Sequence, residues 1–299
     1  PWDGEAPRQP LRRWSRRTLA TVESLLALMS SALWGTADFL GGVASKKRPP
    51  LAVVGFSQTF GLIVMLVVAT ATMSWGADLS YIPWAFMGSA CGILGLLAFY
   101  TALANGVMGI VAPITAAGVV VPVAVGIVRG DVPTAAQAVG IVVAILGIVL
   151  ATGPELRGAG DSKSVIYAAI AGVLFGLVFV ALAGGGESSS IMTVTAMRII
   201  SVTGLVIAGL FARSLGGVTR ADLPAIAAVG AFDALANVAL GAAAQNNNLT
   251  ITAVLGSLYP IITALLAWWF LNERMRRIQY FGVAVAMVGV VVLSASGGH

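Results

Sequence analysis

The sequence predicts an all-α membrane protein with about ten transmembrane helices, arranged as two inverted five-helix repeats. Three observations predict this fold: the composition, the spacing of the apolar runs, and an internal repeat. The 299 residues are 58% hydrophobic and 10% charged, with a mean hydropathy of +0.95. A soluble domain is about 45–50% apolar and about 25% charged. We therefore expect a multi-pass protein of the cell membrane, with the lipid bilayer as a partner.

Ten apolar runs are candidates for spans, since a helix needs about 20 residues to cross a bilayer. The runs are 22–43, 51–73, 82–105, 109–129, 134–152, 164–183, 191–212, 223–245, 250–271 and 278–296. Charged or turn-forming segments such as SKKRPP, RGDVP and NERMRR separate them. The predicted organisation is a basic tail (1–21), a first repeat (22–152), a linker (153–163) and a second repeat (164–297).

The two halves of the chain are related by a shift of 142 residues. Without a gap, the shift superimposes Gly88 on Gly230, Asn105 on Asn247, Asp131 on Glu273, Gln137 on Gln279, Gly140 on Gly282 and Gly147 on Gly289. A shift of 141 places Trp34–Gly35 on Phe175–Gly176, and a shift of 140 places Gln58 on Arg198. Five helices per unit is an odd number, so the two copies must cross the membrane in opposite directions. Inverted repeats of this kind are typical of secondary transporters, which work by alternating access.

Several segments resemble the EamA repeat of the drug/metabolite transporter superfamily. The segments are GDVPTAAQAVG, NERMRRIQYFG, LWGTADFLGG and AVLGSLYPIITALLAWWFLNE. The resemblance runs from about Leu25 to Ser296. It implies ten helices around a central cavity lined by the first, third and fourth helices of each repeat. It also implies transport, since members of the family export amino acids, other metabolites or drugs. The sequence departs from the family pattern in two places. The usual Gly-Glu pair is Gly130-Asp131 in the first repeat and Asn272-Glu273 in the second. The arginine of the second helix is present in the second repeat as Arg198, and Gln58 takes its place in the first.

The residue counts exclude several other classes of protein. With one cysteine (Cys91) and one histidine (His299), the chain has no intrachain disulfide, Cys/His zinc site or Ser-His-Asp triad. We therefore expect no enzyme, no metal and no cofactor. The net charge of +5 comes from residues flanking the spans rather than from one basic helix, which argues against nucleic acid.

Three ionisable residues lie well inside predicted spans: Asp38, Asp233 and Arg198. Each costs about 2.5–3.5 kcal/mol at a helix centre on insertion scales, so each should face protein or water and have a partner. Asp233 and Asn237 lie four residues apart and share a helix face. Asp233 either binds a substrate group or a proton near the midplane, or forms a structural pair with Arg198.

Aromatic residues complete the predicted binding site. Trp34 lies one turn from Asp38, nearer the membrane centre, and should form a cavity wall, with Asp38 nearer the mouth. The alternative is that Asp38 hydrogen-bonds a neighbouring helix. Tyr100 and Tyr259 lie on helices expected to line the cavity, and Tyr259 precedes Pro260, where a broken backbone can expose carbonyls.

Other polar and small residues are expected to be structural. Asp131 and Glu273 lie at span ends, where capping or interfacial pairing is favoured over transport chemistry. Small residues form a packing stripe on the fifth helix of each repeat: Gly140, Ala144 and Gly147, and Gly282, Ala286 and Gly289.

The sequence therefore predicts a secondary active transporter, an exporter of small, amino-acid-like metabolites. A multidrug/proton antiporter is the alternative, followed by a channel or a component of a lipid flippase. Proton coupling stays open. Arginines in the tail place both termini in the cytoplasm, although Lys46–Arg48 and Arg274–Arg277 would then lie outside, against the usual bias of basic residues.

Overall fold

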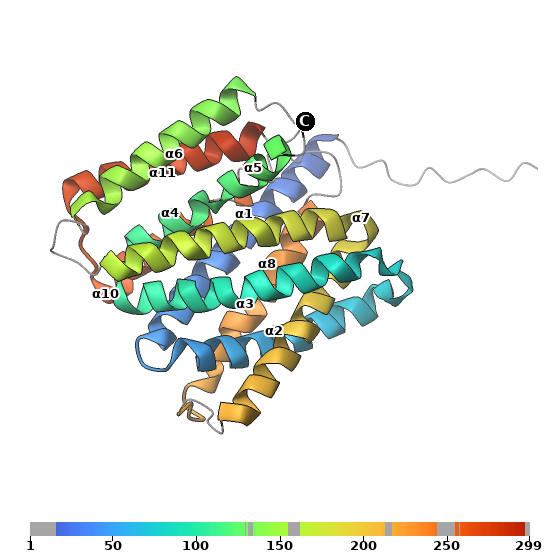
Figure 1. The fold of residues 1–299 in the computed structure, drawn as a ribbon. Helices are drawn as coiled ribbons and strands as arrows, with labels where there is room; N and C mark the ends of the chain where they lie inside the picture. Colours follow the sequence, from blue (N-terminus) through green and yellow to red (C-terminus); the bar gives the residue numbers. More distant parts are fainter. Residues whose placement is uncertain are drawn as a thin grey trace, which may run out of the picture.

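The structure, a computed structural model, describes residues 16–128, 130, 134–154, 162–212, 217–243, 255–256 and 258–296. Within these residues every regular element is a helix, as predicted (Figure 1). The α-helices are α1 (Arg16–Ser45), α2 (Pro50–Ala71), α3 (Ile82–Asn105), α4 (Met108–Ala116), α5 (Val120–Val128), α6 (Ala135–Pro154), α7 (Ser162–Ala212), α8 (Leu223–Ala243), α10 (Tyr259–Leu271) and α11 (Arg277–Ser296). Short 3-10 turns are η1 (Ser74–Gly76), η2 (Leu79–Tyr81) and η3 (Ala117–Val119).

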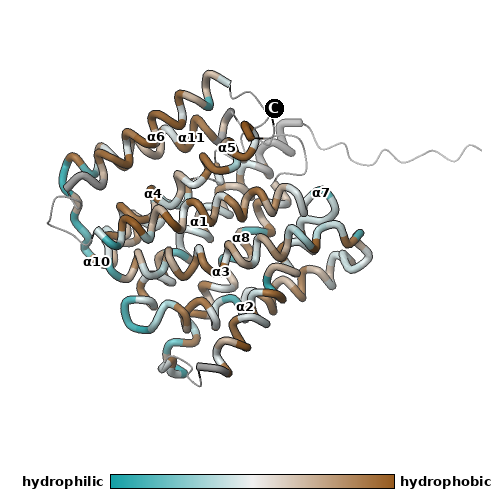
Figure 2. Tube along the Cα trace, viewed as in Figure 1, coloured by the Kyte–Doolittle hydropathy of each residue, from teal (hydrophilic) through white to brown (hydrophobic). Residues whose placement is uncertain are grey.

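The helices have the length and composition of an integral membrane protein. Among the described residues, six helical segments are long and apolar enough to cross a bilayer: Ser24–Ser45, Pro50–Ala71, Leu79–Asn105, Met108–Val128, Ser162–Leu210 and Leu223–Ala243. Three shorter apolar helices are Ala135–Ala151, Tyr259–Leu271 and Arg277–Leu293. Figure 2 shows hydrophobic residues along the helices and hydrophilic ones gathered at turns.

Helix α7 differs from the two separate helices expected at 164–183 and 191–212. It is one element that folds back on itself, because Ser189 leaves the helical conformation (φ −163°, ψ 112°). A Cβ atom placed on Gly88 would lie 2.8 Å from Met197 Sδ and 3.2 Å from Ala181 Cβ. In a straight helix residues 181 and 197 would be about 24 Å apart, so α7 bends sharply between them and both limbs contact α3. Figure 1 shows the two limbs diverging from the bend.

The fourth expected span, 109–129, corresponds to Met108–Val128 and contains a short 3-10 turn. Helix α4 ends at Ala116, η3 follows, and α5 resumes at Val120. Pro113 lies inside α4 and has no N–H to donate to the preceding turn. The start of the ninth expected span, 250–271, lies outside the described residues, and helix α10 begins at Tyr259.

The predicted small-residue stripes of α6 and α11 lie against each other. A Cβ atom built on Gly147 would overlap the backbone of Ala286, and one built on Gly282 would overlap the backbone of Ala151. Glycine at these positions therefore lets the two backbones touch, as in closely packed membrane helices. The two helices form one edge of the molecule (Figure 1).

Other helix contacts join the two halves of the chain. Helix α1 packs on α8, and α3 packs on α7, which is the same contact with the halves exchanged. Gly35 of α1 approaches Ile262 of α10. Its repeat counterpart, Gly176 of α7, approaches Val121 of α5.

Candidate functional site

A cavity of about 140 Å³ opens between the two halves, several times the space that one water molecule needs. Six helices contribute to its wall: α1, α2, α3, α7, α8 and α10. The lining residues are Trp34, Asp38, Gln58, Gly88, Gly92, Leu96, Phe175, Val178, Phe179, Leu182, Val194, Met197, Arg198, Ser201, Asp233, Asn237 and Tyr259.

Helix α1 carries Trp34 and Asp38 into this cavity. The two residues are four apart and so lie on one face of the helix. Hydrogen bonds to α8 and to α10 hold this part of the helix. Ser30 Oγ donates to the Ala236 carbonyl of α8 at 2.9 Å, and Thr263 Oγ1 of α10 donates to the Gly35 carbonyl at 3.2 Å.

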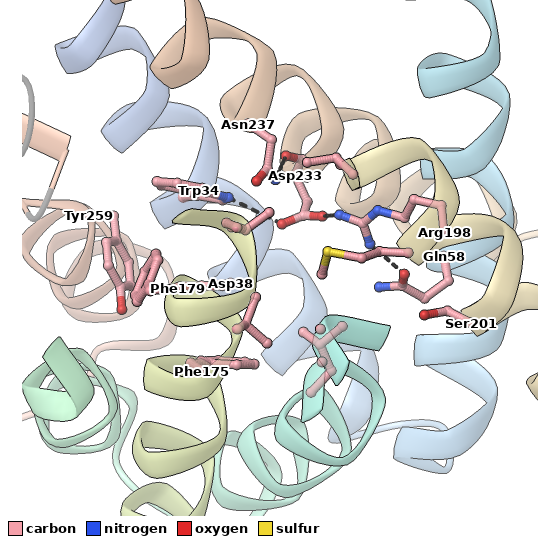
Figure 3. Close-up of a pocket in the computed structure, with 17 residues that line it drawn as sticks. Trp34, Asp38, Gln58, Phe175, Phe179, Arg198, Ser201, Asp233, Asn237 and Tyr259 are labelled. Atoms are coloured by element: carbon pink, nitrogen blue, oxygen red, sulfur yellow. Dashed lines mark hydrogen bonds and ion pairs between the residues drawn. The ribbon is translucent and has the colours of Figure 1, made fainter. Parts of the chain in front are cut away.

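Arg198 and Asp233 form an ion pair in the wall, between Arg198 Nη2 and Asp233 Oδ2. Arg198 Nη1 also donates to Gln58 Oε1. The other Asp233 oxygen accepts the Trp34 indole N–H at 3.2 Å, so four helices meet in this network (Figure 3). The Arg198 side chain is 11% exposed and that of Asp233 is 27% exposed. The structural pair that the sequence left open for Arg198 is thus formed.

Asp38 stands apart from this network. Among the residues that the structure describes, no hydrogen bond or ion pair reaches its carboxylate, although it lines the same cavity. The ionisable side chains in the lining are therefore two carboxylates, Asp38 and Asp233, and one guanidinium, Arg198. Arg198 pairs with Asp233, so Asp38 is the acidic residue of the lining that has no ion-pair partner among the described residues.

Aromatic rings surround the carboxylates on the side away from Arg198. Trp34 and Tyr259 meet edge to face, with ring centroids 6.1 Å apart. Phe175 and Phe179 of α7 also line the cavity (Figure 3). Rings of this kind attract a cation over their faces and accept an apolar group against them.

The sequence-based candidates meet in this cavity with one exception. Trp34, Asp38, Asp233 and Tyr259 line it. Asn237 lines it too, and its amide nitrogen donates to the Asp233 carbonyl at 2.7 Å.

Tyr100 is the exception. It is 3% exposed, packs in a hydrophobic cluster and is not among the residues lining the cavity. Tyr100 lies outside the cavity because its ring packs against Gly41 of α1, which has no side chain. A Cβ atom on Gly41 would lie 2.5 Å from the Tyr100 ring. The ring therefore fills the space that a glycine leaves in α1.

The sequence analysis missed Phe175, Phe179 and Gln58 as site residues. Phe179 has no distinguishing signal in an apolar helix. Phe175 and Gln58 could have been found, since they are the repeat counterparts of Trp34 and Arg198.

Of the two acidic residues expected to be structural, Asp131 lies outside the described residues. Glu273 lies at the end of the bundle, where its carboxylate accepts the Met108 backbone N–H at 2.8 Å. No group of three or more potential metal ligands occurs in the part of the chain that the structure describes.

Comparison with known proteins agrees with this fold. The profile of the EamA-like transporter family matches the chain twice, at residues 21–153 and 162–295. The chain belongs to the EamA-like transporter family. The predicted membership of the drug/metabolite transporter superfamily is confirmed, and the protein is accordingly an integral membrane transporter.

A solved structure described only as "Crystal structure of protein" resembles this EamA-like transporter in fold. The TM-score is 0.62 at 16% sequence identity, over 91% of this chain and 97% of the other. No curated protein matches the sequence.

Proposed function

We propose that this EamA-like transporter is a secondary active exporter of small metabolites that carry an amine, such as amino-acid-like solutes. The observation that carries the proposal is the Asp38 carboxylate, which faces the cavity between the halves without a partner in the described part of the chain. A carboxylate in a low-dielectric cleft attracts a cation strongly. The aromatic rings of Trp34, Phe175 and Tyr259 suit the remainder of such a solute.

Alternating access would follow from two inverted five-helix repeats, 22–152 and 164–297, giving ten spans in total. The exchanged contacts support this arrangement, since α1 packs on α8 as α7 packs on α3. The fold of α7 at Ser189 also supports it, because the element then supplies two spans. A site between two such halves can be exposed to either side by rocking one half against the other.

A proton antiporter is the second candidate, and the same observation favours it. A partnerless carboxylate can hold either a proton or the ammonium group of a substrate. Exchange of one for the other at Asp38 would couple export to a proton gradient. The aromatic lining would equally suit a range of apolar cations, as in a multidrug antiporter.

For orientation, we propose that both termini are cytoplasmic, because arginines 12, 13, 16 and 17 precede the first span. The basic residues 46–48, 274, 276 and 277 at the other end oppose this arrangement, and a fusion experiment tests it directly. A reporter fused after His299 should be active only in the cytoplasm. Activity in the periplasm instead would reverse the orientation.

The function is tested by transport in proteoliposomes with phenethylamine as the probe and 3-phenylpropionate as its anionic analogue. Wild-type protein should move the amine and discriminate against the acid. Asp38→Asn should weaken amine affinity about 10-fold or more, since a hydrogen bond to a charged group contributes about 1.5–3 kcal/mol.

The matched control is Asp78→Asn, an exposed carboxylate outside the cavity whose oxygen accepts the Ser80 N–H. This variant should behave as wild type. Equal affinity of the Asp38→Asn and wild-type proteins for the amine would reject the proposed role of Asp38. Transport of the acid in preference to the amine would reject the substrate class.

A further inference from the structure

Two ion pairs join the first half of the chain to the second at one end of the helical bundle. Lys46 Nζ lies 3.3 Å from Glu273 Oε1, and Arg48 Nε lies 2.9 Å from Asp222 Oδ2. Lys46 and Arg48 belong to the turn between α1 and α2, Glu273 to the segment between α10 and α11, and Asp222 to the turn before α8. These four residues are called the ion-pair cluster below.

Both acids of the cluster are held by further hydrogen bonds. Glu273 Oε2 accepts the N–H of Met108, the first residue of α4, at 2.8 Å. Asp222 Oδ2 accepts the backbone N–H and the hydroxyl of Thr219 at 2.8 and 2.7 Å. The carboxylates are therefore fixed in place, and the lysine and arginine reach across to them from the other half.

A layer of buried side chains lies between the cavity and the ion-pair cluster. Asp38 is seven residues from the end of α1 at Ser45, about 10 Å along the helix. Within that distance α1 packs closely: Cβ atoms on Gly41 and Gly42 would lie 2.5 Å from the Tyr100 ring and 2.7 Å from Met108 Cε.

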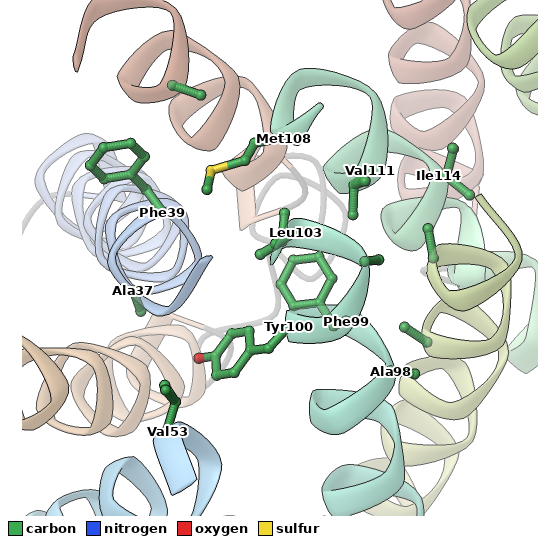
Figure 4. Close-up of a cluster of buried hydrophobic side chains, with 14 of the residues drawn as sticks. Ala37, Phe39, Val53, Ala98, Phe99, Tyr100, Leu103, Met108, Val111 and Ile114 are labelled. Carbon is green, nitrogen blue, oxygen red and sulfur yellow. The ribbon is translucent and has the colours of Figure 1, made fainter. Parts of the chain in front are cut away.

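The layer continues through neighbouring residues of α1 and α3. Phe39 is 8% exposed and Leu103 is fully buried. Figure 4 shows the Tyr100 ring between α3 and α1, with its hydroxyl pointing toward Ala37 and Val53.

The opposite end of the bundle has a different charge pattern. The charged side chains that the structure describes there are Asp78 and Glu187, which are both acidic. They cannot pair with each other, and no ion pair joins the halves among the described residues at this end. The described side-chain hydrogen bond between the halves there runs from Ser188 Oγ to the Asp78 carbonyl at 2.6 Å. It lies beside a hydrophobic cluster in which Tyr81 and Ala85 pack with Met192.

We propose that the ion-pair cluster and the buried layer beneath it form the closed gate of the transport pathway in this conformation. Opening the cavity to this end requires both cross-half pairs to break, while no ion pair between described residues joins the halves at the opposite end. The proposal assigns to Lys46 and Arg48 control over which side the cavity faces. It depends on alternating access and not on the identity of the substrate.

The test is the accessibility of a cysteine in the cavity to a membrane-impermeant maleimide. The protein carries Cys91→Ala and Ser201→Cys, since Ser201 lines the cavity. Lys47→Cys and Met73→Cys, made separately, identify the two sides, because both positions are exposed at opposite ends. The cysteine at position 201 should react from the side of residue 73 and be protected from the side of residue 47.

Lys46→Gln should then raise labelling of position 201 from the side of residue 47 by about two- to five-fold, the range that partly exposed ion pairs contribute. Lys47→Gln is the matched control: it removes the neighbouring charge, which has no ion-pair partner among the described residues, and should change nothing. High salt should act in the direction of Lys46→Gln, because it screens the pair.

Two results would overturn the gate. One is labelling of position 201 from the side of residue 47 in protein with an intact ion-pair cluster. The other is equal labelling of the Lys46→Gln and Lys47→Gln proteins. Neither result depends on amine transport, so the gate can fail while the proposed substrate site stands.

Discussion

Replacing Asp233 with asparagine should destabilise the folded protein, and replacing Arg198 with glutamine as well should restore most of the loss. The Asp233 carboxylate forms an ion pair with the Arg198 guanidinium and accepts a hydrogen bond from the Trp34 indole N–H. The Arg198 side chain is 11% exposed. Asparagine keeps an acceptor for Trp34, so the change removes the charge and little else. The guanidinium is then left in the wall of the cavity with Gln58 as its described partner.

The size of the effect follows from the burial of the pair. Removing one partner of a fully buried pair costs about 3–5 kcal/mol. Asp233 is 27% exposed and lines the cavity, so water can solvate part of the remaining charge, and we expect about 2–3 kcal/mol. The assay is the free energy of unfolding in a detergent titration, measured for wild type, Asp233→Asn, Arg198→Gln and the double variant.

The double variant should recover to within about 1 kcal/mol of wild type, because an uncharged Gln-Asn pair leaves no unbalanced ion. An Asp233→Asn protein as stable as wild type would refute the reasoning. Asp233 would then be free to bind a proton or an ammonium group, the role considered for it from the sequence. Transport retained by the double variant would exclude that role.

Two further predictions concern packing and pH. Gly147→Leu should destabilise the protein by several kcal/mol, since a side chain there would overlap the backbone of Ala286. Gly204→Ala, with no atom within 4 Å of the added Cβ, should be neutral or stabilising by about 0.5–1 kcal/mol. Thermal unfolding of the two variants tests the contrast, and an equal loss of stability in both would contradict it. The backbone N–H and hydroxyl of Thr219, with Arg48 nearby, hold the pKa of Asp222 below its ordinary value. Because the folded-state pKa is the lower one, the stabilisation from this contact is fully present above the unfolded pKa of about 4 and is lost as the pH falls through the folded value. The difference in the free energy of unfolding between wild type and Asp222→Asn should therefore be constant from about pH 8 to 5 and shrink below about pH 4. A difference that changes between about pH 5 and 8 would show that another group is titrating.

The membrane fold could be predicted because lipid imposes it on the composition and on the lengths of the apolar runs. Asp38, Asp233 and Arg198 could be selected for the same reason, since an ionisable residue in an apolar span needs a cavity or a partner. Whether Asp233 pairs with Arg198 or stays free for a ligand depends on how α7 and α8 cross. That information is absent from the spacing of residues along any one helix.

Two details could not be predicted from the sequence, for a common physical reason. The sequence predicts Tyr100 in the cavity because it lies on a cavity-lining helix, but its ring lies against Gly41 of α1, 59 positions earlier. The 3-10 turn η3 within the fourth span lies where Gly118 meets Gly172 of α7. Contacts between distant backbones therefore fix these details.

The contact between α6 and α11 has the form of an interface between two copies of one protein. Gly140 of α6 packs against Leu293, and its repeat counterpart Gly282 packs against Ala151, the counterpart of Leu293. The same patch thus serves both partners, which is the property of an isologous dimer interface. In a chain half this length, every substitution in the patch would have altered both sides of the contact at once.

Fusion of the two halves removes that constraint. Each half of the present chain can change alone, and the cavity shows the result: Asp233 occurs where the first half has Cys91, and Arg198 where it has Gln58. A symmetric scaffold thereby encloses an asymmetric arrangement of charges. Asp38 is supplied by the first repeat, while the ion pair that neutralises Arg198 is supplied entirely by the second.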